Sequence, residues 1–295
     1  MAVLIDGKKI AQEIKNELKL KVNELKSSGM KVPGLVTILV GDNPASQSYV
    51  TSKSKACVEL GMLSKVERLD SSISENELLS LVQKYNNDEN YHGILVQLPL
   101  PKHINEEKII QSISPSKDVD GFHPISVGNL MIGSDTFYPC TPYGIVELLK
   151  RYKIETSGKH VVVVGRSNIV GKPIANMLLQ KKEGANAIVT VCHSAAKDLS
   201  QYTKTADILI AAIGKPFYIK DDMVKDGVVV IDVGINRVPD SSAKKGYRVV
   251  GDVDFANVEK KASYITPVPG GVGLMTIAML LLNTFHAYLK IEKVD

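Results

Sequence analysis

Two side chains that can take part in proton transfer, Tyr49 and Lys53, lie four residues apart in the first third of the chain. Asn43 is a typical helix N-cap residue and Gly61 suits a helix end, so we expect a helix between them. Tyr49 and Lys53 would then share one face of that helix. A phenol beside an amine can assist acid–base catalysis. Taken alone, however, the pair favours a surface lysine packed along a half-buried tyrosine.

Two further segments could contribute to the same site. Gln97 follows a short apolar strand expected at 93–96, and ligands of open α/β sheets collect at the carboxyl ends of strands. Asp118 and Asp120 lie in a turn closed by Gly121, which is either an Asx-type turn or a site that reads ligand donor groups. Because no other ligands are suitably spaced, we expect no metal site.

A second kind of chemistry, phosphate binding, is indicated by the glycines of VVVVGRSNIVGKP. Gly165 follows an apolar strand expected at 160–164, and Gly171 begins an expected helix. Backbone amides at such a helix start can hold a pyrophosphate. The spacing is not the common G-x-G-x-x-G, and glycine after a buried strand is often only a tight turn. Three further strands at suitable separations favour a dinucleotide-binding sheet.

The end of the next strand indicates which dinucleotide binds. NAD-binding sheets commonly place an acidic residue there to bind a ribose hydroxyl. Here the strand ends in Cys192, His193 and Ser194, with no carboxylate, and Arg166 lies in the glycine turn. An arginine and a hydroxyl would hold a 2′-phosphate that a carboxylate would repel. We therefore predict NADP as the cofactor.

These residues need elements to position them, and apolar periodicity predicts two α/β units with mainly parallel sheets. We expect the junction near 140–155, where Thr141 is a candidate N-cap. In the first unit we expect helices at 8–28, 43–60 and 74–86 and strands at 34–40 and 93–96. In the second we expect strands at 160–164, 187–192, 206–214 and 228–235, helices at 171–181 and near 195–204, a strand or hairpin at 247–254, and a last helix from about 274 to 289.

Composition bounds the remaining possibilities. A chain of 295 residues suggests about two domains at roughly 150 residues each. With 44% apolar and 23% charged residues it is a typical folded protein. A net charge of +4, no Trp and only 5 Phe disfavour a nucleic-acid partner. Cys57, Cys140 and Cys192 are too far apart to suggest zinc or a disulfide framework.

Membrane insertion is also disfavoured by the sequence. The N-terminal segment MAVLIDGKKI lacks the apolar core and cleavage site of a signal peptide. The longest apolar stretch, 274–282, is too short to span a bilayer. We expect a cytoplasmic protein with no membrane partner.

The sequence resembles the bifunctional methylenetetrahydrofolate dehydrogenase/methenyltetrahydrofolate cyclohydrolase family. Eight segments occur in family order between about residues 41 and 284, which is nearly the whole chain. They are YVTSKSKACVELGM, GILVQLPLP, KDVDGFHP, PCTPYGI, VVVGRSNIVGKP, VIDVGINR, GDVDF and TPVPGGVGLMT.

The resemblance implies a role for each matching position. Lys53 would be the catalytic lysine, Tyr49 would position the substrate and Gln97 would tune the lysine. Asp120 would bind the pterin ring. Arg166 and Ser194 would face the NADP phosphate, Gly165, Ser167 and Ile235 would line the cofactor site, and Pro267, Gly270 and Gly271 would border the folate cleft.

The resemblance also implies the fold and the reaction. Two α/β domains would flank a cleft: residues 1–140 with 273–295 would bind folate, and a Rossmann-like domain, 141–272, would bind NADP. Tetrahydrofolate derivatives would be the substrates, and the protein would be a homodimer. Hydride would pass from 5,10-methylenetetrahydrofolate to NADP, and water would then open the methenyl cation to 10-formyltetrahydrofolate. A charged Lys53 would repel that cation, so we expect the neutral amine during hydrolysis.

One departure from the family pattern is visible. The family usually reads GGVGPMT, whereas Leu274 stands here in the proline position. Proline suits the first turn of a helix and restricts the residue before it. We expect its absence to loosen the loop beside the folate cleft without removing a catalytic group.

Three other functions compete with this one. The Tyr-x-x-x-Lys pair also occurs in short-chain dehydrogenases, but there the glycine turn precedes the pair, whereas here it follows by more than 100 residues. A shikimate-type NADP reductase is disfavoured by the QLPLP and PGGVG segments. A non-catalytic NADP sensor is disfavoured because Tyr49, Lys53, Gln97 and Asp120 are present together.

Overall fold

The computed structural model describes residues 2–243 and 246–294, and the chain divides into two compact units. Two long helices, α1 (Gly7–Ser27) and α10 (Val272–Glu292), each pass from one unit into the other along the sequence. Residues 1–11 and 273–276 belong to the unit that contains the glycine turn, and not to the unit with Lys53. Unit 1 consists of Met1–Ala11 and Thr141–Thr276, and unit 2 consists of Gln12–Cys140 and Ile277–Asp295.

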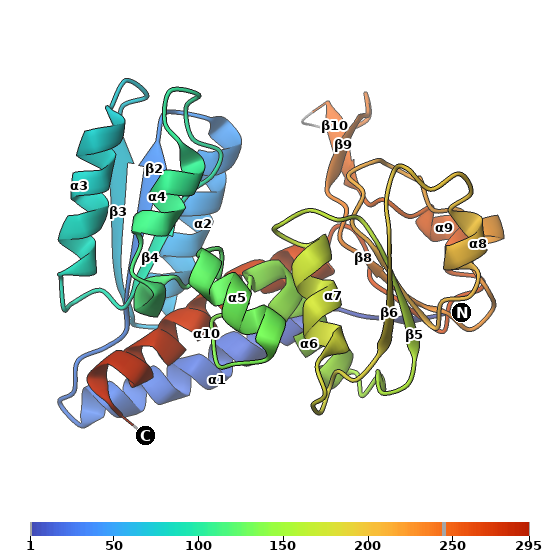
Figure 1. The fold of residues 1–295 in the computed structure, drawn as a ribbon, viewed down its shortest axis with the longest axis horizontal. Coiled ribbons are helices and arrows are strands. Elements are labelled where there is room, and N and C mark those ends of the chain that lie inside the picture. The colour runs from blue at the N-terminus through green and yellow to red at the C-terminus, as the bar shows by residue number, and fades with distance from the viewer. Residues whose placement is uncertain (1, 244–245, 295) are drawn as a thin grey trace. The chain divides into compact units, whose positions relative to one another are not determined.

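Unit 2 is built on a three-stranded parallel sheet in the order β3-β2-β4 (Figure 1). The central strand β2 (Gly34–Val40) is an uninterrupted apolar run, apart from Thr37, and is buried along its whole length. Such runs are typical of parallel strands that are covered on both faces. β4 (Gly93–Val96) is also buried, whereas the outer strand β3 (Leu63–Leu69) alternates and carries three charged residues.

Helices cover both faces of this sheet. α3 (Glu75–Asn86) and α4 (Glu106–Ser112) pack on the face formed by Val36, Ile38 and Val40. α2 (Pro44–Glu59) packs against β2 and β3. The chain between β4 and unit 1 then forms a short 3-10 turn, η1 (Pro115–Lys117), and the helix α5 (Pro124–Ile132).

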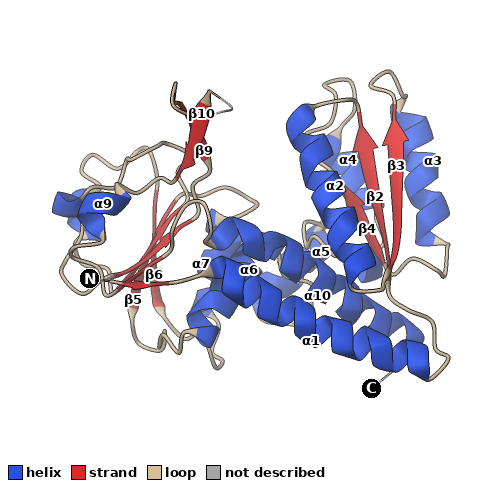
Figure 2. Cartoon of the chain, turned by 180° about the vertical axis from the view of Figure 1, so that it is seen from behind, coloured by secondary structure: helices blue, strands red, loops and turns tan. Residues whose placement is uncertain are grey.

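Unit 1 contains a six-stranded parallel sheet, seen in red in Figure 2. Its strand order is β1-β11-β8-β7-β5-β6. After β1 the chain returns to this sheet at β5, then adds β6 on one side of β5 and β7 on the other, so the strand order reverses at β5. Ligands of open α/β sheets bind at the carboxyl ends of the strands beside this point. The strands are β1 (Val3–Leu4), β5 (His160–Val164), β6 (Ile188–Cys192), β7 (Ile208–Ala211), β8 (Val229–Asp232) and β11 (Tyr264–Ile265).

Short helices and one hairpin complete unit 1. An apolar core that includes Val162, Leu209 and Val230 packs under the segments around α9 and η2. The remaining elements are α6 (Cys140–Arg151), α7 (Gly171–Leu179), α8 (Ser200–Thr203), η2 (Asp221–Met223), α9 (Phe255–Val258) and an antiparallel hairpin of β9 (Asn236–Pro239) and β10 (Tyr247–Val250).

The prediction of α/β architecture with mainly parallel sheets is confirmed, but two local predictions are wrong and β3 is absent from the prediction. α6 begins at Cys140, so Thr141 is a helical residue and not the N-cap, and its hydroxyl lies 3.0 Å from that of Thr276. The stretch near 195–204 is helical only over Ser200–Thr203. β3 was not expected, because its charged residues hide the strand pattern.

α10 is longer than the sequence pattern suggested. It is the one described helix whose length and hydropathy would suffice to cross a membrane, but 61% of its most apolar window is buried inside the protein. In unit 2, Asn283 of this helix donates hydrogen bonds to the carbonyls of Val119 and Tyr138. These contacts are typical of a core helix.

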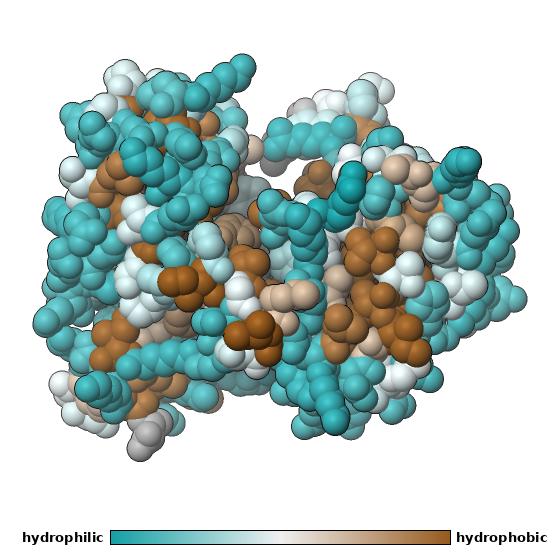
Figure 3. All heavy atoms as spheres, in the orientation of Figure 1, coloured by the Kyte–Doolittle hydropathy of each residue, from teal (hydrophilic) through white to brown (hydrophobic). Residues whose placement is uncertain are grey.

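On the face seen in Figure 3, hydrophilic residues predominate and hydrophobic ones lie in scattered groups.

Candidate active site and cofactor site

Lys53 is an almost fully buried amine on α2, with 7% of its surface exposed. The helix starts as expected, because the Asn43 side chain accepts hydrogen bonds from the amides of Ala45 and Ser46. Lys53 Nζ donates to Gln97 Oε1 at 3.0 Å, and Gln97 Nε2 donates to the carbonyl of Leu98 at 2.8 Å. The hydrogen bond to Leu98 therefore fixes the Gln97 amide with its oxygen toward the Lys53 amine. The structure brings these two predicted residues together.

The partner of Lys53 is a neutral amide. Within the described residues, no carboxylate lies at ion-pair distance from Lys53 Nζ. The contact with Gln97 therefore positions the amine without stabilising its charged form through an ion pair. One helical turn earlier, Tyr49 is 43% exposed, so its phenol is available to a ligand.

The two carboxylates of the KDVDG turn have different environments. Asp118 is buried and accepts hydrogen bonds from Ser126 Oγ at 2.7 Å and from the amide of His123 at 2.9 Å. Burial raises its pKa to about 6, although these hydrogen bonds act in the opposite direction. Asp118 is thus the structural residue of the turn. Asp120 is only partly buried, which leaves it available to a ligand.

Cys140 adjoins this turn, and the sequence gives no sign of its position. Its thiol is fully buried and donates to the carbonyl of Val119 at 3.5 Å. Burial, together with the neighbouring carboxylate of Asp120, raises the pKa of the thiol well above its ordinary value. Cys140 is therefore a neutral thiol. The carboxylate of Asp120 and the amine of Lys53 are both close enough to influence its pKa.

In unit 1, close packing requires glycine at both positions of the phosphate-binding turn. Gly165 has φ +133°, and a Cβ there would lie 2.2 Å from the carbonyl oxygen of Ala212. A Cβ on Gly171 would lie 2.2 Å from the carbonyl oxygen of Gly165. The turn therefore packs backbone against backbone at the end of β5, as close approach to a phosphate requires.

The side chain of Ser167 binds the backbone amides at the start of α7 that the sequence predicts for phosphate binding. Its hydroxyl accepts hydrogen bonds from the amides of Val170 at 3.1 Å and Gly171 at 3.3 Å. Its carbonyl accepts from the amide of Lys172 at 3.0 Å. The amides at the start of α7 therefore already have partners within the protein. A phosphate at this turn would have to compete for them or bind the exposed Arg166 that precedes Ser167.

Arg166 and Ser194 are exposed residues that follow neighbouring strands. Val164 pairs with Cys192 in register, and the amide of Gly165 donates to the carbonyl of Cys192 at 2.8 Å. Arg166 is thus one residue beyond Gly165, and Ser194 is two residues beyond Cys192, at one edge of the sheet. The predicted pair of 2′-phosphate ligands follows two strand ends that lie side by side.

The glycines of the PGG turn are held closely by the start of α1. The amide of Lys8 donates to the carbonyl of Gly270 at 3.1 Å, and a Cβ on Gly7 would lie 2.1 Å from the carbonyl oxygen of Gly271. A Cβ on Gly271 would lie 2.6 Å from the carbonyl oxygen of Pro267. Pro267, Gly270 and Gly271 therefore form one compact turn in unit 1.

Leu274 stands three residues after Gly271, and the expectation that it loosens this loop stays a prediction. Its amide donates to the carbonyl of Gly271 at 3.3 Å, which a proline could not do. Ile235 lies next to Gly273, since a Cβ on Gly273 would lie 3.2 Å from Ile235 Cδ1. Ile235 is 53% exposed. The predicted cofactor residue Ile235 is thus an exposed apolar side chain beside the start of α10.

The predicted site residues form two sets, one in each unit. Within the described residues, no group of three or more His, Cys, Asp or Glu side chains is arranged to hold a metal ion. Unit 2 holds Tyr49, Lys53, Gln97 and Asp120, and unit 1 holds Gly165, Arg166, Ser167, Ser194, Ile235, Pro267, Gly270 and Gly271.

Comparison with known proteins assigns a family to both parts of the chain. The catalytic domain of tetrahydrofolate dehydrogenase/cyclohydrolase matches residues 5–120. The NAD(P)-binding domain of tetrahydrofolate dehydrogenase/cyclohydrolase matches residues 139–292. The two matches follow each other along almost the whole chain.

Individual relatives agree with these matches. Bifunctional protein FolD of Chloroherpeton thalassium is 59% identical over 288 residues, covering 97% of this chain and 98% of the relative. The crystal structure of the bifunctional FolD methylenetetrahydrofolate dehydrogenase/cyclohydrolase of Campylobacter jejuni is 55% identical, with a TM-score of 0.93 and coverage of 98% and 99% of the two chains. The Trypanosoma brucei FolD, solved with NADP cofactor and inhibitor, is 40% identical, with a TM-score of 0.92 and coverage of 98% of each chain. The chain therefore belongs to the tetrahydrofolate dehydrogenase/cyclohydrolase family.

Proposed function

We propose that the Lys53–Gln97 pair carries the proton chemistry of a bifunctional enzyme of folate one-carbon metabolism. The protein is a methylenetetrahydrofolate dehydrogenase and a methenyltetrahydrofolate cyclohydrolase, as membership of its family indicates. It oxidises 5,10-methylenetetrahydrofolate to the methenyl cation and hydrolyses the cation to 10-formyltetrahydrofolate. The observation that supports the residue assignment is a buried amine held by a neutral amide.

The cofactor is NADP, which accepts the hydride in the first step. The residues of unit 1 fit such a group, because the glycine turn leaves no room for a Cβ and lets backbone approach a phosphate. Arg166 and Ser194 would bind the 2′-phosphate, and Gly165, Ser167 and Ile235 would line the site. The positive charge of Arg166 and the hydroxyl of Ser194 both favour this phosphate over a free ribose hydroxyl.

The hydrolysis step requires a group that removes a proton from water. In our proposal Lys53, as the neutral amine, accepts this proton while the water oxygen bonds to the methenyl carbon. The same proton can then pass to the ring nitrogen as its bond to the former methenyl carbon breaks, and the second proton of the attacking water leaves to solvent as the water oxygen becomes the formyl carbonyl. The positive charge of the methenyl cation leaves with this second proton, and the lysine ends as the neutral amine. Gln97 keeps the amine oriented, and its neutral carbonyl does not hold the lysine in the charged form by ion pairing.

Substrate binding would fall to five of the predicted residues. Asp120, partly buried beside Cys140, is an acceptor for the N–H donors of a pterin ring. Tyr49, exposed on the same helix as Lys53, would position the substrate. Pro267, Gly270 and Gly271 would border the folate. In this proposal residues 1–140 with 273–295 bind folate and residues 141–272 bind NADP. This functional division differs from the packing units at residues 1–11 and 273–276, which group with unit 1.

We also propose that the enzyme is a cytoplasmic homodimer without nucleic-acid or membrane partners. β6 is the last strand of the unit 1 sheet, and no described strand pairs with its outer edge. Its side chains include Ile188, which is 63% exposed, and Val191. An exposed apolar edge strand is an aggregation risk that a two-fold symmetric contact would remove. All three cysteines are unpaired and buried, which fits a reducing compartment.

A coupled assay with methylenetetrahydrofolate and either NADP or NAD tests this function. We expect kcat/KM to be at least tenfold higher with NADP, because Arg166 and Ser194 would bind its extra phosphate. Arg166→Ala should reduce this ratio, mainly through KM for NADP. An equal or greater kcat/KM with NAD would contradict the assignment of Arg166 and Ser194.

A further inference from the structure

Two buried carboxylates, Asp232 and Asp252, join the loops of unit 1 and take no part in the chemistry proposed above. Asp232 is the last residue of β8 and is 3% exposed. Asp252 follows β10 and is 0% exposed. Burying a carboxylate is costly unless it is hydrogen-bonded or paired. The contacts of each therefore show what the pair does.

Asp252 accepts four hydrogen bonds, two on each carboxylate oxygen. Oδ2 accepts from the amides of Ile213 at 2.6 Å and Gly214 at 2.9 Å. Oδ1 accepts from the amide of Lys215 at 3.0 Å and from Asn236 Nδ2 at 2.8 Å. Three successive amides that follow β7 thus converge on one side chain, which also holds the first residue of the β9–β10 hairpin.

Asp232 extends the same network to neighbouring segments. Its Oδ1 accepts from the amides of Gly234 and Asp252, both at 2.9 Å. Its Oδ2 accepts from the amide of Val253 at 3.0 Å. Its own amide donates to Thr266 Oγ1 at 2.7 Å, directly before the turn that contains Pro267 and Gly270.

Two glycines make this packing possible. A Cβ on Gly234 would lie 2.3 Å from Asp252 Oδ1, and a Cβ on Gly251 would lie 1.8 Å from Asp232 Oδ2. Each carboxylate therefore occupies the space that a side chain on the opposite loop would fill. The glycines and aspartates of VIDVGI and GDVD are required together, as one structural unit.

The segments held by this pair lie at the edge of the sheet where the cofactor residues lie. The loop after β7 begins with Ala212, whose carbonyl oxygen is the atom that excludes a side chain at Gly165. Ile235 stands between Gly234 and Asn236, which bond to Asp232 and Asp252 respectively. The pair therefore fixes the backbone of two segments that contact or contain predicted cofactor residues.

We infer that Asp252, oriented by Asp232, is a positioning residue for dinucleotide binding, holding the loop 212–215 and Ile235 in the arrangement that NADP requires. This inference rests on the proposed placement of the cofactor. At position 252 only a side-chain carboxylate has two oxygens that can each accept two of the four hydrogen bonds from Ile213, Gly214, Lys215 and Asn236. An asparagine would present an NH2 group to two N–H donors, and buried donors left without acceptors are destabilising.

The test compares Asp252→Asn with the same substitution two residues away, Asp254→Asn. The Asp254 side chain accepts a hydrogen bond from Asn257 Nδ2, and within the described residues it has no hydrogen bond with Asp232, Asp252 or the groups that donate to them. NADPH affinity is measured by direct titration, KM for NADP is measured in the dehydrogenase assay, and hydrolysis of supplied methenyltetrahydrofolate is measured without cofactor. For Asp252→Asn we expect NADPH affinity at least tenfold weaker, KM for NADP raised to match, and hydrolysis within twofold of the wild type. Asp254→Asn should behave as the wild type in all three.

Asn236→Ala covers the case in which Asp252→Asn does not fold. It removes one donor to Asp252 and should weaken NADPH binding severalfold while hydrolysis stays unchanged. Unchanged NADPH affinity in folded Asp252→Asn, or an equal loss of both activities in folded Asn236→Ala, would overturn the inference. Arg166→Ala separates this failure from a misplaced cofactor. If Arg166→Ala weakens NADPH binding and the Asp252 variant does not, only the positioning role is wrong; if neither weakens it, the cofactor lies elsewhere.

Discussion

The two aspartates of the KDVDG turn show how far a single residue's role depends on its surroundings. Both lie in one short motif, and the sequence left open whether the motif is a turn or a ligand site. The structure assigns the turn to Asp118, which is buried and accepts several hydrogen bonds. Asp120 is left partly accessible beside Cys140.

Replacing Asp120 with alanine should therefore weaken folate binding without unfolding unit 2. A hydrogen bond to a charged group contributes about 1.5–3 kcal/mol, which predicts a rise of roughly ten- to a hundredfold in KM for methylenetetrahydrofolate. KM for NADP should not change. Steady-state kinetics with each substrate varied in turn measures both. Asp118→Asn is the contrasting variant and should lower the melting temperature, and a folate KM unaffected by Asp120→Ala would exclude the proposed pterin contact.

At this scale, sequence patterns located residues better than they explained them. The types and spacing of Tyr49, Lys53 and Gln97 predict candidate site residues, and the structure places Lys53 and Gln97 in contact. The same reasoning indicates Asp118 and Asp120 together, and only the family resemblance selects Asp120. Their catalytic roles stay predictions. Cys140 and Asp252 could not be found in this way, because their partners come from distant segments and no local pattern marks them.

The helix α2 is the element on which the proposed active site depends, since it carries both Tyr49 and Lys53. Its start was predictable from Asn43, because capping is a local interaction between a side chain and amides two or three residues away. β3 was not predictable, since an outer strand with Lys65, Glu67 and Arg68 lacks an apolar run. Strand β1 has only two residues and gives no periodic signal at all.

Removing the cap of α2 should lower the stability of unit 2. Asn43→Ala leaves the amides of Ala45 and Ser46 without their acceptor, at a cost of about 1 kcal/mol in the free energy of unfolding. Asn43→Gly is the matched control and should lose only a few tenths of a kcal/mol. Urea titrations of the three proteins measure the difference. Equal stability of wild type and Asn43→Ala would show that this cap contributes nothing.

Over the whole molecule, the division into units depends on contacts that sequence patterns do not carry. Residues 1–11 group with unit 1, partly because β1 pairs with β11.

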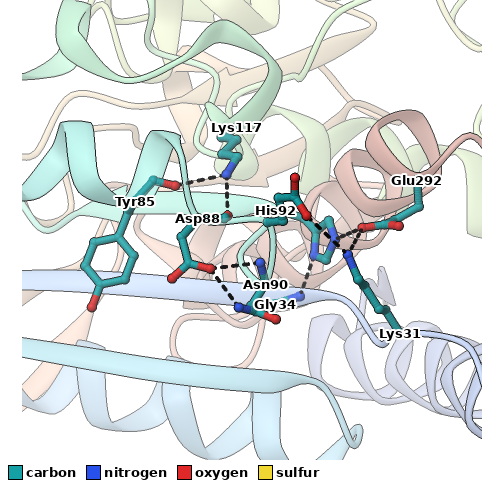
Figure 4. Close-up of polar contacts among 9 residues, drawn as sticks. Lys31, Gly34, Tyr85, Asp88, Asn90, His92, Lys117 and Glu292 are labelled. Atoms are coloured by element: carbon teal, nitrogen blue, oxygen red, sulfur yellow. Dashed lines mark hydrogen bonds and ion pairs between the residues drawn. The ribbon is translucent and has the colours of Figure 1, made fainter.

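In unit 2, the end of α10 is held by a buried histidine (Figure 4). His92 Nδ1 accepts from the amide of Gly34 at 3.0 Å, and Nε2 lies 3.2 Å from Glu292 Oε1. Nε2 must therefore carry the proton of a neutral ring.

This histidine should make folding stability sensitive to acid. Burial lowers the pKa of His92 below its ordinary 6.5, against the opposing effect of Glu292. Between that lowered pKa and 6.5 the unfolded chain binds more protons, so stability is complete above about pH 6.5 and falls as pH decreases. Protonation would also place an N–H against the amide of Gly34. The pKa values of Asp118 and Asp232 are both raised to about 6, so these two carboxyl groups have the opposite effect: they make the folded state more stable as pH falls from 6 to 4.

A variant that keeps an acceptor but cannot titrate isolates the histidine from these carboxylates. The contribution of His92 to stability decreases as pH falls from 7 to 5, and His92→Gln lacks this decrease while keeping the contributions of the two carboxylates. The difference in the free energy of unfolding between the two proteins should therefore shift toward the variant at low pH. Urea denaturation of both proteins across this range measures it. A difference that does not vary with pH would show that His92 does not titrate differently on folding.

The assignment of hydrolysis to Lys53 is tested most directly by Lys53→Met, in which methionine replaces the buried aliphatic stem and removes the amine. Oxidation of methylenetetrahydrofolate by NADP and hydrolysis of methenyltetrahydrofolate are followed separately by absorbance. We predict that hydrolysis falls at least a hundredfold, within the range of general acid–base catalysis, while the dehydrogenase still forms the methenyl product, which accumulates. A Lys53→Met enzyme that hydrolyses methenyltetrahydrofolate at the wild-type rate would contradict the proposed role of this amine.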